Sequence, residues 1–189
     1  MRGQRSISSG QVFVSFNEDP QVDLLFWRKH IVIHMLDSCI RWSQAEIVPT
    51  KEAGDVLECI TLLWIRQYGP PKTITSDNEG ALDSEQGRQW ATRWNVSLRF
   101  RPKGTKAWTV ERHNELLRRV LHSVQDQLLE DGINVSPRCI VAESVFAKNC
   151  MLSIHGASPY QALLGRQPPI LMDFEPASAT ALADAQTGA

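Results

Sequence analysis

The sequence predicts an α/β protein in which helices cover both faces of a mixed five-stranded sheet. Three β-rich segments near the start follow one another with short links, which is typical of an antiparallel meander. Two later β-rich segments alternate with helical patterns, and this alternation favours parallel crossovers. The expected order is therefore three strands, a helix, a strand, a helix, a strand and two helices.

The three leading strands are expected over residues 22–27, 30–37 and 42–48, which are rich in aliphatic and aromatic residues. Arg28 and Lys29 separate the first two as a tight hairpin, and Pro49 ends the third. Two shorter strands are expected over 72–76, ending at Asp77, and over 96–100. The segment 11–16 is a further candidate for a short strand.

Helical patterns fill the intervals between these strands. A first helix is expected over 51–68, with Thr50 as its N-cap and Gly69 as its end, and a second over 84–95. The longest pattern covers 109–131, where apolar residues recur at helical spacing up to Gly132. A further helix is expected over 136–151, followed by a helical turn over 158–165.

Composition excludes several classes of protein. The 189 residues suit one domain with its own core, and 42% hydrophobic against 22% charged residues is typical of a folded chain. No apolar run approaches the roughly 18–20 residues of a membrane span, and no signal peptide is apparent. The four cysteines form no CxxC pair, which argues against a disulfide scaffold or a cysteine-rich zinc site and favours a reducing, intracellular setting.

Charge is distributed unevenly along the chain. The net charge is -1, but residues 97–122 contain seven basic and two acidic side chains. Such a segment is either the solvated surface of a helix and loop or a stripe that contacts phosphate groups.

Three acidic residues lie where this architecture can bring them together. Asp23 interrupts an apolar strand, Asp77 ends a strand next to a parallel crossover, and Glu111 lies in the first turn of the longest helix. Clustered carboxylates repel one another and suit a hard cation such as Mg²⁺ or Mn²⁺. Two such ions activate a water or hydroxyl and stabilise the leaving oxygen of a phosphodiester. Taken singly, Asp77 also suits a turn, and Glu111 suits a helix N-terminus.

The motifs around these residues resemble the catalytic core of retroviral and LTR-retrotransposon integrases, which belong to the RNase H-like superfamily. The resemblance covers roughly residues 22–169 and depends on the order and spacing of its parts. These parts are Val22-Asp23 with the hairpin into Leu36-Asp37, Ile74-Thr75-Ser76-Asp77-Asn78-Glu79-Gly80, Val110-Glu111-Arg112-His113-Asn114-Glu115-Leu116, and Gly156-Ala157-Ser158-Pro159-Tyr160-Gln161-Ala162-Leu163-Leu164-Gly165-Arg166.

By this resemblance, Asp23, Asp77 and Glu111 correspond to the catalytic, metal-binding D, D and E of the family, holding two Mg²⁺ or Mn²⁺ ions. The implied reaction is DNA 3′-end processing followed by strand transfer into target DNA. The implied partners are retroelement ends, target DNA and further copies of the chain. The residues expected to contact DNA are Lys103, Lys106, Arg118 and Arg119.

The sequence pattern and the resemblance together imply a division of the chain, and the resemblance implies a location. We expect a flexible segment over 1–20, an integrase-type catalytic core over 21–152, a post-core helical segment over 153–174 and a disordered tail over 175–189. The location would be the nucleus in a eukaryotic host. Two other functions stay open, namely a non-catalytic retrotransposon-derived module for DNA binding or assembly, and a nuclease of the same fold.

Some residues compete with these assignments. Asp37 lies on the strand next to Asp23 and is expected to form local hydrogen bonds, and Glu115 lies one turn after Glu111. His113 is expected to pack or to cap and not to act as an acid or base. Trp108 lies close to Glu111 in the sequence, and its side chain is a candidate for contact with DNA.

Overall fold

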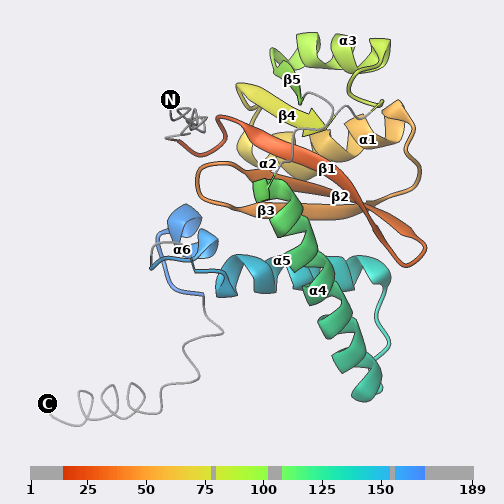
Figure 1. The fold of residues 1–189 in the computed structure, drawn as a ribbon, viewed down its shortest axis with the longest axis vertical. Helices are drawn as coiled ribbons and strands as arrows, with labels where there is room; N and C mark the ends of the chain where they lie inside the picture. Colours follow the sequence, from red (N-terminus) through yellow and green to blue (C-terminus); the bar gives the residue numbers. More distant parts are fainter. Residues whose placement is uncertain (1–14, 78–79, 102–107, 154–155, 169–189) are drawn as a thin grey trace, which may run out of the picture.

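The computed structural model describes residues 15–77, 80–101, 108–153 and 156–168. Its central feature is a five-stranded sheet with the strand order β3-β2-β1-β4-β5 (Figure 1). The first three strands pair antiparallel, whereas β4 is parallel to both β1 and β5, so the predicted mixed sheet is confirmed. The strands are β1 (Pro20–Trp27), β2 (His30–Asp37), β3 (Ser43–Val48), β4 (Thr73–Asp77) and β5 (Ser97–Arg101).

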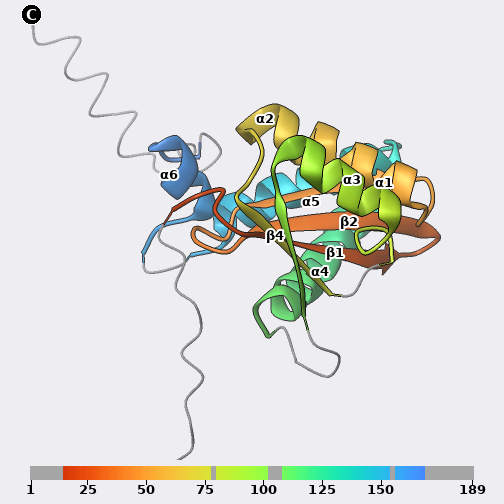
Figure 2. The same cartoon turned by 90° about the horizontal axis from the view of Figure 1, so that it is seen from above.

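Helices cover both faces of this sheet. The helices α1, α2 and α3 lie on one face and α4 lies on the other (Figure 2), and α5 packs against α4 and β3. The helical segments are α1 (Ala53–Ile60), the π-helical turn η1 (Thr61–Ile65), α2 (Arg66–Tyr68), α3 (Glu85–Trp94), α4 (Trp108–Glu130), α5 (Pro137–Met151) and α6 (Pro159–Leu164).

Each face of the sheet has its own apolar core, because successive side chains of a strand point to opposite faces. On the α1 side, Val22 of β1 packs with Ile60 and Trp64. On the α4 and α5 side, Leu25 packs with Leu117 and with a set that comprises Trp27, Val32, Ala45, Leu121, Ile140, Val141 and Val145. The same alternation places Asp23 on the α4 side of the sheet, the side on which Leu25 is buried.

The first helix differs from its prediction at two points. Glu52, and not Thr50, is the N-cap, because the Thr50 hydroxyl accepts from the Glu52 N–H at 3.1 Å and donates to the Asp55 carboxylate at 2.6 Å. The helix also widens into the π-helical turn η1 before it ends at Gly69, where φ is 79°. The predicted end at Gly69 is confirmed.

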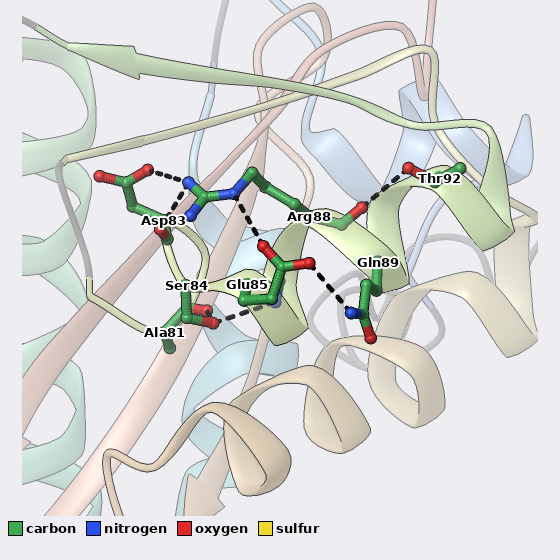
Figure 3. A network of polar contacts seen from close by, with 8 residues as sticks. Ala81, Asp83, Ser84, Glu85, Arg88, Gln89 and Thr92 are labelled. Carbon is green, nitrogen blue, oxygen red and sulfur yellow. Dashed lines mark hydrogen bonds and ion pairs between the residues drawn. The ribbon is translucent and has the colours of Figure 1, made fainter.

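The segment after β4 turns sharply into α3 (Figure 3). The Ser84 hydroxyl accepts from the Gly87 N–H at 3.0 Å and donates to the Ala81 carbonyl at 2.7 Å, so that one side chain caps the helix and closes the turn. Arg88 binds Asp83 at 3.1 Å and lies 3.8 Å from Glu85. This network fixes the turn over residues 81–84 that leads into α3.

Several expectations lie outside the described residues. They are most of the predicted strand over 11–16, the whole tail over 175–189 and the basic loop residues Lys103 and Lys106. In the part of the chain that the structure describes, none of the helices has both the length and the apolar character needed to cross a membrane.

Candidate active site

Asp23 and Asp77 come from neighbouring parallel strands. Val22 of β1 pairs with Ser76 of β4, so the next residue of each strand is one of the two aspartates. Burial raises the pKa of Asp23, and the charge of Asp77 raises it further, while the Leu24 N–H and the Asn114 amide oppose the shift. The two carboxylates therefore lie close enough to repel each other, as groups that share a cation do.

Arg101 partly offsets this negative charge. It lies opposite Asp77 in the β4–β5 pairing and donates to its Oδ1 at 2.8 Å, and it also binds the Gln21 side chain. The side chain of Arg101 is 15% exposed, whereas that of Asp77 is 49% exposed and open to further ligands. The sequence places Arg101 only in the general basic segment, and its pairing with Asp77 is seen in the structure alone.

Glu111 has a different environment from the two aspartates. It is exposed in the first turn of α4, and it makes no hydrogen bond or ion pair within the described residues. Asn114, one turn later and on a neighbouring side of the helix, donates its side-chain amide to Asp23 Oδ2. This contact anchors the start of α4 at Asp23, with Glu111 one turn before the contact.

The donor set fits a hard divalent cation in part. Asp23 and Asp77 supply the carboxylate oxygens that Mg²⁺ or Mn²⁺ prefers, and their mutual repulsion is what a cation relieves. However, no group of three or more histidine, cysteine or acidic side chains is arranged as a metal site in residues 15–77, 80–101, 108–153 and 156–168. Asp23 and Asp77 are thus brought together by the strand pairing, and the role of Glu111 as a third ligand stays a prediction.

Asp37 has a local role that agrees with its prediction. Its Oδ1 accepts from the N–H groups of Cys39 and Ile40 at 2.9 and 2.8 Å, and its Oδ2 accepts from the Asn17 N–H at 3.0 Å. The carboxylate is fully buried, and both of its oxygens accept hydrogen bonds from backbone N–H groups. Asp37 therefore holds the loop that follows β2 and is not a rival of Asp23.

The basic residues of α4 are on its exposed side. Arg118 and Arg119 are both exposed, and Arg119 is paired with Glu115 one turn earlier. Glu115 is also exposed, so its burial gives no reason to prefer it to Glu111 as the metal ligand. Arg99 of the same basic segment pairs with the buried Asp19 at 2.9 Å, which gives it a role in the fold.

His113 packs against the sheet, as expected. It is 8% exposed, its Nδ1 has no hydrogen-bond partner within the described residues, and burial lowers its pKa to about 3, assisted by the charges of Lys148, Arg41 and Arg112. Since the unfolded chain binds this proton near pH 6.5, His113 makes the fold less stable as the pH falls from 6.5 towards 3.

We therefore expect His113→Gln to flatten the acid side of the stability curve. Relative to the variant, the unmutated chain should lose up to about 1.4 kcal/mol of unfolding free energy per pH unit below pH 6.5. Urea unfolding at several pH values measures this difference. His122→Gln, on the exposed side of the same helix, should keep the original slope. Equal slopes for His113→Gln and the unmutated chain would contradict the assignment.

The fold is similar to that of solved structures. The chain is similar to the catalytic core domain of BIV integrase, with a TM-score of 0.67 and 17% sequence identity over 84% of this chain and 99% of that chain. It is also similar to the HTLV-2 integrase catalytic core domain, solved in complex with magnesium in a trimeric form, with a TM-score of 0.61 and 16% identity over 77% and 95% of the two chains. No family model and no curated protein sequence matches the chain.

Proposed function

Because the chain has the fold of retroviral integrase catalytic cores, the RNase H-like fold, we propose that it is a polynucleotidyl transferase core acting on DNA. Its reaction would be metal-dependent 3′-end processing followed by strand transfer. The observation that carries this proposal is the adjacency of Asp23 and Asp77 on parallel strands, with the Asn114 amide holding Asp23. Fold alone does not specify chemistry, so the proposal depends on these side chains.

In this proposal Asp23, Asp77 and Glu111 hold Mg²⁺ or Mn²⁺. The metal would supply activation of the attacking oxygen and stabilisation of the leaving oxygen of the phosphodiester. The protein contributes position: Asn114 orients the Asp23 carboxylate, and Arg101 limits the repulsion between Asp23 and Asp77 before a cation binds. Glu111 would join them from the first turn of α4, one turn before the contact between Asn114 and Asp23.

Two observations favour the non-catalytic alternative, a DNA-binding or assembly module. Glu111 makes no hydrogen bond or ion pair within the described residues, and Arg101 already occupies one oxygen of Asp77. A domain that had lost its reaction would tolerate both features. The alternative predicts DNA binding without any metal-dependent product.

A strand-transfer assay separates the possibilities. The full chain is incubated with Mg²⁺ or Mn²⁺, a labelled oligonucleotide with a recessed 3′ end and a target duplex. Joined products support the transferase, cleavage alone supports a nuclease of this fold, and neither supports the non-catalytic module. Asp23→Asn serves as the control that must remove any joined product, which also excludes a contaminating activity.

Binding of DNA should depend on the exposed arginines of α4. We expect Arg118→Ala to reduce the slope of log affinity against log salt by about one, because each phosphate contact releases about one counterion. Arg119→Ala should have a smaller effect, since Glu115 already engages this arginine. Fluorescence anisotropy over a salt series measures the slopes. An unchanged slope in the double variant Arg118→Ala/Arg119→Ala would refute the assignment of DNA binding to this surface.

A further inference from the structure

A buried row of polar side chains crosses the sheet beneath α4 and α5. This polar row, as we call it, consists of Asp23, Asn114, His34, Ser43 and Lys148, which come from three neighbouring strands and two helices. His34 and Ser43 are fully buried, and Asn114 and Lys148 are 3% and 2% exposed. Polar groups this deep are found where their hydrogen bonds are satisfied, so the pattern of bonds defines what the row does.

The hydrogen bonds of the polar row all point in one direction. Asp23 Oδ2 only accepts, so it takes the Asn114 amide N–H, which turns Asn114 Oδ1 towards His34 Nδ1 at 2.5 Å. An amide oxygen cannot donate, so Nδ1 carries the proton of the imidazole. His34 Nε2 then accepts from the Ser43 hydroxyl at 3.1 Å, and Ser43 Oγ accepts in turn from Lys148 Nζ.

Burial keeps the imidazole in the neutral form that this direction requires. Desolvation, with a contribution from the charge of Lys148, lowers the pKa of His34 to about 3. Ser43 itself is fixed at its backbone, where its N–H donates to Asn149 Oδ1 and its carbonyl accepts from Asn149 Nδ2, each at 2.9 Å. The Ser43 hydroxyl is thus held between His34 and Lys148.

Lys148 is the unexpected member of the row. Within the described residues it has no ion pair, and its hydrogen bond goes to Ser43. Burial of an amine without a carboxylate costs stability, and here it lowers the pKa of Lys148 to about 7. As an ammonium group Lys148 can only donate, so it takes one lone pair of Ser43 Oγ and leaves His34 Nε2 as the acceptor of the hydroxyl proton.

We propose that Lys148, Ser43 and His34 are positioning residues, which hold the Asn114 side chain with its amide nitrogen towards Asp23. With the Asn114 amide reversed, its oxygen would face the Asp23 carboxylate and its N–H would face His34 Nδ1, which would have to pass its proton to Nε2. The Nε2–H would then face the Ser43 hydroxyl, whose own proton would lose its acceptor. The row thereby keeps the Asp23 carboxylate in one orientation. Its importance for catalysis rests on the proposed function, whereas its effect on Asn114 does not.

The test uses the full chain and two variants that open the row. Lys148→Met removes the amine at similar volume, and Ser43→Ala removes the link between Lys148 and His34. Since Ser43→Ala leaves a buried amine without a partner, the double variant Ser43→Ala/Lys148→Met serves if the single variant folds poorly. Ser144→Ala is the matched control, because Ser144 is equally buried on α5 and its hydroxyl has no partner within the described residues.

Nitrogen-15 NMR of the imidazole and of the Asn114 side chain gives the metal-free readout. In the unmutated chain and in Ser144→Ala, His34 should carry its proton on Nδ1, and the Asn114 amide should give one ordered pair of signals. In the variants that open the row, we expect a mixture of His34 tautomers and a less ordered Asn114 amide. Turnover in the strand-transfer assay should fall about tenfold or more at unchanged KM for DNA.

A proton on His34 Nε2 in the unmutated chain would overturn the proposal. So would NMR signals or turnover in the opened variants that match those of Ser144→Ala. If the unmutated chain shows no metal-dependent product, the proposed function fails, and the NMR comparison alone decides whether the row orients Asn114.

Discussion

Replacing Glu111 with glutamine should reduce the rate of metal-dependent phosphoryl transfer by at least about 100-fold. A bound metal ion stabilises the transition state by several kcal/mol, and this change removes one of its anionic ligands. The change keeps the size and shape of the side chain. Since Glu111 is exposed and has no partner within the described residues, the melting temperature should stay the same. DNA binding should also persist, because its contacts are assigned to other residues of α4.

Glu115→Gln is the matched control for this experiment. It makes the same chemical change one turn further along α4, at a residue whose carboxylate is paired with Arg119. Transfer should remain close to that of the unmutated chain. Loss of activity in Glu115→Gln with retention in Glu111→Gln would mean that the ligand lies one turn later. Full activity in both variants would show that neither Glu111 nor Glu115 of α4 is a metal ligand.

The second large effect is expected at Gly87, in the first turn of α3. A Cβ at this position would lie 2.3 Å from the Leu82 carbonyl oxygen and 2.7 Å from that of Ala81, and both contacts are with backbone. The turn that follows Asp77 would have to move. We expect Gly87→Ala to lower the free energy of unfolding by about 3 kcal/mol or more. The corresponding fall in melting temperature is about 6–12 °C for a chain of this size.

Gly54→Ala provides the control, since it places the same substitution in the first turn of α1. There the nearest atom to a new Cβ is the end of the flexible Gln86 side chain at 3.7 Å. This variant should gain about 0.5–1 kcal/mol, because alanine restricts the unfolded chain. Thermal unfolding of both variants measures the contrast. A Gly87→Ala protein as stable as Gly54→Ala would show that the turn after β4 adapts freely.

The fold could be predicted from the sequence because its signals are local. The β-rich apolar runs of β1 and β2, and the serines at 84, 136 and 158 that precede α3, α5 and α6, act over a few residues. The π-helical turn η1 was missed because no residue type marks it. The prediction of Thr50 as the N-cap was wrong. Thr50 lies two residues before the actual N-cap, Glu52, and its hydroxyl accepts from the Glu52 N–H instead of from the first turn of the helix.

The site was predictable only as far as topology determines it. Parallel pairing of two strands brings Asp23 and Asp77 together, and that pairing follows from the order of elements. The partners of these aspartates could not be predicted. Arg101 and Asn114 reach them from β5 and α4, and nothing in the local pattern distinguishes them from other polar residues of the same segments.

The contacts that complete the polar row also set an order of events during synthesis. Asn114 lies 91 residues after Asp23, and Lys148 lies 105 residues after Ser43. A nascent chain that ends before α5 has its three antiparallel strands but lacks the amine and the amide that hold β3. Pairings this distant form late in folding, since the loops between them must close first. The polar row can therefore be completed only after the ribosome has released α5.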